Sequence, residues 1–265
     1  MLRQAQQPML RQAQQPTNSL PINRDKQLTN SLPINREKQL TNSLSHYMFQ
    51  QSTLDFLAHL KANNNKDWFE KNRKAYDAAR ADQYAFIAAL GKEMHKWDDR
   101  ITILDPKKHT MRINRDIRFS KDKSPYKSSL SFHFSPSGDG PHGGYYFHLE
   151  PGATFVGGGL YALEPDKIKA VRQEIDYNLD EFSGIMNNKG FKKYFSLLKG
   201  DALKTAPKDY PKDHPGIEWL KHKDFIVSHH LSDAELLAKD LIPKVNDIYK
   251  TMQPFMVFMD RAIGQ

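Results

Sequence analysis

The hydrophobic period of this chain changes twice, from helical spacing to alternation and back, which constrains the fold more than any other feature. From residue 52 onward apolar side chains recur at helical spacing, as in Leu54, Leu57 and Leu60. Residues 110–161 then alternate apolar and polar side chains, and helical spacing returns after Pro165. The sequence therefore predicts an α+β domain with N-terminal helices, a central and mainly antiparallel sheet, and C-terminal helices. The expected strands are 110–119, 129–134, 144–149, 154–161 and 225–231.

Residues 1–47 lie ahead of this pattern and consist of short repeats. LRQAQQP occurs twice, and TNSLPINRDKQL is followed by TNSLPINREKQL. These units are polar and broken by prolines, so they cannot bury enough apolar surface to offset the entropy of ordering. We expect a disordered leader, duplicated at the DNA level and read through from upstream of an initiator at Met48. The alternative is a tethering arm for a partner. Residues 48–265 are then one α+β domain.

Composition excludes several classes of chemistry. The chain has no cysteine, which removes disulfides, thiolate nucleophiles and Cys-based metal sites and fits a reducing compartment. No apolar run reaches the roughly 18 residues of a membrane-spanning helix, so no membrane partner is expected. Of 39 Lys/Arg and 31 Asp/Glu, six and two lie in residues 1–47, which leaves a mild net charge of +4 on the domain. This charge disfavours a nucleic-acid partner without excluding one.

Four strings of residues carry a resemblance to a known family. They are NNNKDWFEKNRKAY (63–76), RDIRFSKDKSPYK (115–127), GYYFHLEPG (144–152) and PKDYPKDHPGIEWLKHKDF (207–225). In this order they resemble the bacterial domain-of-unknown-function family 2461 over nearly all of residues 48–264. The resemblance implies a cytoplasmic bacterial protein of one domain, and it supplies no activity, cofactor or catalytic residue.

The alternation of the central strands predicts one apolar and one polar face of the sheet. Arginines and histidines gather on the polar face, and the loop after residue 119 adds lysines and a tyrosine. Guanidinium groups bind phosphate or carboxylate through paired hydrogen bonds, and aromatic rings nearby allow stacking. The alternatives are an ordinary solvated face or a structural Arg–Asp network. The candidate ligand-binding residues are Arg112, Arg118, Lys123, Tyr126, Lys127, His133, Tyr146 and His148.

Arg115 departs from this pattern, because strict alternation places it on the apolar face. We expect it to be buried in a structural ion pair with Asp116, unless a bulge turns it outward. No metal site is predicted, since no zinc motif is present; a cluster of His133, His148 and Asp116 is the one alternative. The glycines 157–159 match no phosphate-binding motif and indicate close backbone packing.

Three functional classes remain open. The first is a module that binds a small phosphate- or carboxylate-bearing molecule on the polar face. The second is an enzyme acting on an anionic substrate there, with His133 or His148 as the acid–base group. The third is a protein- or nucleic-acid-interaction module. A deep pocket would favour the first two, and basicity extending beyond residues 115–127 would favour nucleic acid.

Overall fold

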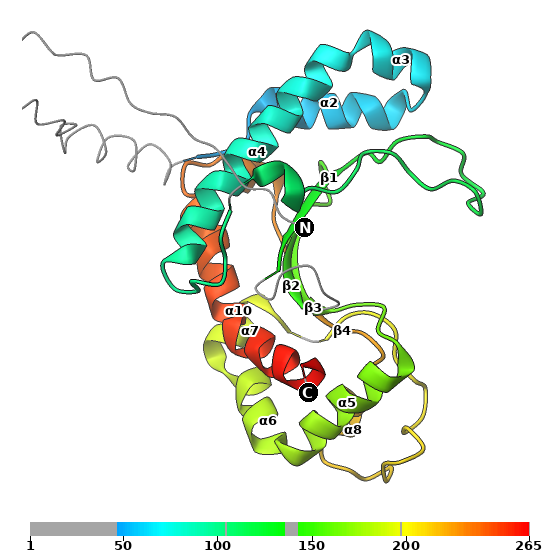
Figure 1. The fold of residues 1–265 in the computed structure, drawn as a ribbon, viewed down its shortest axis with the longest axis vertical. Helices are drawn as coiled ribbons and strands as arrows, with labels where there is room; N and C mark the ends of the chain where they lie inside the picture. The colour runs from blue at the N-terminus through cyan, green and yellow to red at the C-terminus, as the bar shows by residue number, and fades with distance from the viewer. Residues whose placement is uncertain (1–46, 104, 136–142, 197, 265) are drawn as a thin grey trace, which may run out of the picture.

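The computed structural model describes residues 47–103, 105–135, 143–196 and 198–264, so the predicted leader lies outside them except for Tyr47. The fold is α+β, as predicted: helices precede and follow a four-stranded antiparallel sheet (Figure 1). The helices before the sheet are α2 (Gln51–Ala62), α3 (Lys66–Lys71), α4 (Arg73–His95) and the 3₁₀ turn η1 (Pro106–His109). The strands are β1 (Leu130–Phe134), β2 (Gly144–Leu149), β3 (Phe155–Leu160) and β4 (Phe225–His230). The remaining helices are α5 (Pro165–Tyr177), α6 (Leu179–Asn187), α7 (Lys189–Tyr194), α8 (Ile217–Leu220), α9 (Asp233–Leu236) and α10 (Leu241–Ile263).

The sheet follows the chain order β1-β2-β3-β4, and every neighbouring pair is antiparallel. The predicted alternation is confirmed in β2, where Tyr145, Phe147 and Leu149 are buried while Tyr146 and His148 are half-buried. Helices α4 and α10 cover the buried face, and Figure 1 shows both on one side of the sheet. The opposite face carries no helix from the described part of the chain, so its side chains form an open face.

The glycines of β3 allow close backbone packing against α10 and against the neighbouring strand β4. A Cβ on Gly158 would lie 2.4 Å from the sulfur of Met252, so a glycine here lets α10 approach the strand. A Cβ on Gly157 would lie 2.7 Å from the carbonyl oxygen of Val227 on β4. Gly159 has φ +122, a conformation that side chains rarely adopt. These glycines also leave a stretch of the open face without side chains.

The strand predicted over residues 110–119 is wrong. Only isolated bridges form there, from Thr110 to Phe132 and from Asn114 to Tyr126. Residues 111–128, which we call the arm, instead form an irregular ribbon that leaves the sheet (Figure 1). Its polar side chains pair with one another or are exposed, so the period of two here reflects an extended ribbon and not a sheet strand.

The base of the arm is fixed to the N-terminal helices. The Tyr126 ring stacks on Phe69 with their centroids 4.0 Å apart. The side chain of Asn64 accepts a hydrogen bond from the Tyr126 backbone N–H at 3.1 Å and donates one to its carbonyl at 2.8 Å. The arm therefore projects from a rigid point of attachment.

Candidate ligand groove on the open face of the sheet

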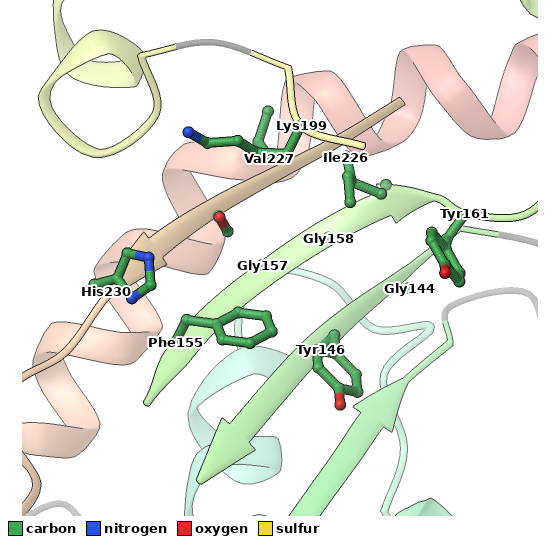
Figure 2. Close-up of a pocket in the computed structure, with 12 residues that line it drawn as sticks. Gly144, Tyr146, Phe155, Gly157, Gly158, Tyr161, Lys199, Ile226, Val227 and His230 are labelled. Atoms are coloured by element: carbon green, nitrogen blue, oxygen red, sulfur yellow. The ribbon is translucent and has the colours of Figure 1, made fainter. Parts of the chain in front are cut away.

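A groove of about 690 Å³ lies across β2, β3 and β4 on the open face. Because successive residues of a strand alternate between faces, the groove receives every second side chain of these strands. Gly157 and Gly159 supply a floor without side chains, and aromatic rings stand beside it (Figure 2). We call this cavity the sheet groove. Its lining residues are Gly144, Tyr146, Phe155, Gly157, Gly158, Gly159, Tyr161, Lys199, Ile226, Val227, Ser228 and His230.

Three aromatic rings and two basic side chains border the sheet groove. Tyr146 and Phe155 lie with their ring centroids 5.7 Å apart, and Tyr161 stands at the other end of the groove with 72% of its surface exposed. Lys199 is exposed at the outer edge of β4, where its backbone pairs with Ile226. His230 contacts Phe155 edge to face. The lining therefore combines apolar rings with positive charge or hydrogen-bond donors at its rim.

A chain of hydrogen-bonding groups leads from the groove into the edge of the sheet. The Tyr146 hydroxyl lies 3.3 Å from Nδ1 of His148, and Nε2 of His148 lies 3.1 Å from a carboxylate oxygen of Glu150. The hydroxyl of Ser131 also lies 3.1 Å from Nδ1, but Ser131 is buried. All of these side chains belong to β1, β2 and the residue after β2. Of the two hydroxyls in this hydrogen-bonded series, the Tyr146 hydroxyl is therefore the one that faces the groove.

The charge on Glu150 decides which way these hydrogen bonds run. Burial raises the pKa of Glu150, but hydrogen bonds from His148 and Lys61 outweigh burial and lower it below its usual range. An ionised Glu150 only accepts hydrogen bonds, so Nε2 of His148 carries the proton that it donates. Nδ1 is then left as the acceptor for the hydroxyls of Tyr146 and Ser131. Lys61 donates to Glu150 at 3.0 Å and joins α2 to this cluster.

The predicted ligand face divides into two places in the structure. His133, Tyr146 and His148 lie on the open face of the sheet, where Tyr146 is the register partner of His133. The other candidates lie in the arm, because residues 110–119 are not a strand. Tyr126 is 7% exposed and belongs to the core at the arm's base, so its ring is not available to a surface ligand. The remaining members in the arm are Arg112, Arg118, Lys123 and Lys127.

The ion pair predicted between Arg115 and Asp116 is replaced by two others. Arg115 is partly exposed and pairs with Asp122, and it also donates to the Ser124 carbonyl at 3.2 Å. Asp116 pairs with Arg118 at 2.8 Å. Arg115 avoids burial because the ribbon turns it toward the tip of the arm. Asp116 therefore lies in the arm, whereas His133 and His148 lie on the sheet. In the described ranges, no three His, Asp or Glu side chains are grouped to hold a metal.

The sequence interpretation missed most of the groove. Phe155, Tyr161, Lys199 and His230 come from β3, its end, and two segments more than 35 residues further on. The signal available was the alternation of residues 225–231, which puts His230 on the same face as Ile226. The glycines of β3 were interpreted as packing residues only, although the same absence of side chains opens the groove.

Comparison with known proteins identifies the family. A family model described as "Conserved hypothetical protein (DUF2461)" matches residues 52–258. The chain belongs to this family. No curated protein and no solved structure matches it. Within the described residues of this DUF2461 protein, no helix has the length and apolar character needed to cross a bilayer.

Proposed function

We propose that the sheet groove binds a small molecule in which a phosphate or carboxylate group is joined to a flat or apolar part. One observation carries the proposal: a glycine-floored groove of about 690 Å³, bordered by Tyr146, Phe155 and Tyr161, has Lys199 at its rim. This volume falls within the roughly 300–1,000 Å³ of small-molecule sites, which combine apolar walls with a few polar groups.

The lining favours this ligand over others. A floor of glycine backbone lets a planar ring lie directly on the strand, and the rings beside it allow offset or edge contacts. Lys199 forms no ion pair with any carboxylate among the described residues, so its charge is available to an anion. His230 at the same rim adds a second hydrogen-bonding group. Binding is thus expected without the arginines of the arm.

The test is a thermal-shift screen of the full chain against nucleotides, sugar phosphates and aromatic carboxylates. A ligand at about 100 times its Kd should stabilise the folded state by about 2.7 kcal/mol. Lys199→Ala and Tyr161→Ala should reduce this shift strongly, since both side chains are exposed and serve no packing role. The matched controls are Lys204→Ala and Tyr177→Ala, which lie away from the groove. A shift that both groove variants retain would contradict the proposal.

A second candidate function is acid–base catalysis on a ligand in the same groove. It is favoured by the hydrogen-bonded series from Tyr146 through His148 to Glu150. With Nδ1 of His148 unprotonated, the imidazole can accept the Tyr146 proton, and the resulting imidazolium is stabilised by Glu150. The Tyr146 oxygen would then act on a bound substrate as a base or a nucleophile.

The tautomer of His148 tests this second candidate without a known substrate. Nitrogen-15 NMR should find the proton on Nε2 and none on Nδ1 at neutral pH. Glu150→Gln should remove this preference, because an amide can donate as well as accept. A proton on Nδ1 in the unaltered protein would leave Tyr146 without a base and would exclude the mechanism.

A further inference from the structure

The net positive charge of the domain is gathered in one projecting segment. The arm, residues 111–128, carries six Lys/Arg and two Asp, a net charge of +4. Residues 48–265 as a whole also carry +4, so the rest of that region is balanced between acid and base. The net charge of +4 is small for residues 48–265, but it is concentrated in the 18 residues of the arm. Figure 1 shows the arm projecting on the side of the sheet away from α4 and α10.

An aromatic side chain stands in the middle of this charge. Phe119 is 95% exposed, which makes it the most exposed of the large apolar side chains in the described residues. The Arg118 guanidinium lies 5.8 Å from the centre of the Phe119 ring and covers one side of it. Exposing a phenylalanine costs hydrophobic free energy that burial elsewhere would recover, so its position is unexplained by folding alone.

The acidic residues of the arm are used internally. Asp122 accepts hydrogen bonds from the Ser124 backbone and hydroxyl at 2.9 and 2.7 Å and pairs with Arg115. Asp116 holds Arg118. Both carboxyl groups have pKa values below their usual range: Asp122 at about 2 because of Ser124 and Arg115, and Asp116 because of Arg118. Both therefore stay ionised and fix the shape of the arm.

Among the remaining cations of the arm, Arg112, Lys121 and Lys123 are exposed. Within the described ranges, Arg112 and Lys121 form no ion pair. Lys127 is partly buried beside Arg112, and burial followed by that neighbouring charge lowers its pKa. Two cations held close together repel each other, and an anion between them would relieve this repulsion. The arm thus presents unpaired charge before and after the exposed Phe119 in the sequence.

We propose that the arm binds single-stranded nucleic acid, with Phe119 stacking on a base and the outward cations contacting phosphates. Single strands offer unstacked bases beside a charged backbone, and their binding sites combine aromatic platforms with basic residues. In a duplex a ring can reach a base face only by unstacking a base step, which costs a few kcal/mol, so the exposed Phe119 favours the single strand. An acidic polypeptide would use the same charge but would not need a stacking ring. This activity is independent of the sheet groove.

Fluorescence anisotropy of the full chain with labelled dT20 and rU20 tests the proposal. If about three phosphates are neutralised, the affinity should fall roughly 20-fold between 50 and 200 mM salt. Phe119→Ala should weaken binding by at least about fivefold at constant salt. Lys121→Ala should lower the slope of log affinity against log salt by about 0.7. Tyr177→Ala, which removes an aromatic side chain 74% exposed on α5, is the matched control and should change nothing.

Several outcomes would overturn the proposal. They are no binding at 50 mM salt, equal affinity for a duplex of the same length, equal affinity for poly-glutamate, or unchanged binding by Phe119→Ala. Because Phe119 is almost fully exposed, its variant should keep the melting temperature of the unaltered chain, and a thermal melt run beside each titration verifies this. If no small molecule binds the sheet groove in the thermal-shift screen, the anisotropy result for the arm is unaffected.

Discussion

Asp82, on α4, holds the first described residues of the chain to the core. It is 7% exposed and accepts hydrogen bonds from the Gln50 backbone at 2.9 Å, from the Thr53 hydroxyl at 2.5 Å and from the Tyr47 hydroxyl. Burial and the hydrogen bond to Asp82 raise the pKa of Tyr47, so the hydroxyl remains a donor. A single carboxylate thus accepts hydrogen bonds from three donors, of which the Thr53 hydroxyl is buried.

Asp82→Ala should destabilise the fold by about 3 kcal/mol, because it removes three hydrogen bonds at once and leaves the buried Thr53 hydroxyl without its acceptor. Urea unfolding followed by tryptophan fluorescence measures the loss. Asp77→Ala is the matched control on the same helix, since Asp77 is exposed and pairs only with the exposed Arg73 at 3.7 Å. It should cost less than about 0.5 kcal/mol. A similar loss in both variants would mean that the helix, and not the buried carboxylate, is responsible.

At the scale of residues, the sequence predicted side-chain directions where a strand formed and failed where it did not. Tyr146 and His148 lie on the polar face as alternation requires. Arg115 does not follow alternation, because its partner Asp122 is seven residues away and reached only by the turn of the arm. Lys199 has no pattern around it that indicates a groove. Contacts between segments distant in sequence leave no local period to read.

At the scale of elements, the backbone of β3 should tolerate no side chain at Gly159. Its φ is +122, and an added Cβ would lie 2.0 Å from the Phe225 carbonyl oxygen of β4. Gly159→Ala should therefore cost more than about 3 kcal/mol in urea unfolding. Gly152→Ala is the comparison, since Gly152 also has positive φ (+74) but open space around it. Gly152→Ala should lower the free energy of unfolding by about 1 kcal/mol. An equal loss of stability in both variants would mean that the positive φ, and not the contact with β4, makes Gly159 necessary.

The start of α9 should make stability depend on pH. Lys244 and the Ser232 capping box lower the pKa of Glu235 from 4.5 to about 2. Because the folded pKa is the lower one, Glu235 stabilises the fold fully above pH 4.5, and this contribution is lost as pH falls toward 2. Glu235→Gln should thus unfold more easily than the unaltered chain at pH 6, and the difference should vanish near pH 2. Glu218→Gln, which removes an exposed carboxylate paired with Lys221, is the control and should unfold like the unaltered chain at pH 6.

The order and type of the elements could largely be predicted from the hydrophobic period. The exception has a physical cause. Residues 110–119 have the alternation of a strand, but their hydrogen bonds close a ribbon with residues 125–132 instead of extending the sheet. At the C-terminal end, α10 begins at Leu241 and takes Pro243 into its first turn, where a proline loses no hydrogen bond.

At the scale of the whole molecule, the two proposed binding surfaces are separate. The sheet groove lies across β2, β3 and β4, and the arm leaves the sheet next to β1. The groove combines rings with little charge, whereas the arm combines charge with one ring. Each can therefore be removed by substitution without altering the other, which makes their functions separable in one protein.

Residues 1–46 provide the last test, because they carry six of the chain's Lys/Arg and only two of its Asp/Glu. Their polar, proline-broken repeats predict no contribution to the stability of the core. A variant that begins at Tyr47 keeps the contact with Asp82, so its melting temperature should equal that of the full chain. A midpoint lower by several degrees would show that these residues stabilise the domain. The same variant separates two sources of positive charge, since binding of dT20 through the arm should survive the truncation and still be lost with Phe119→Ala.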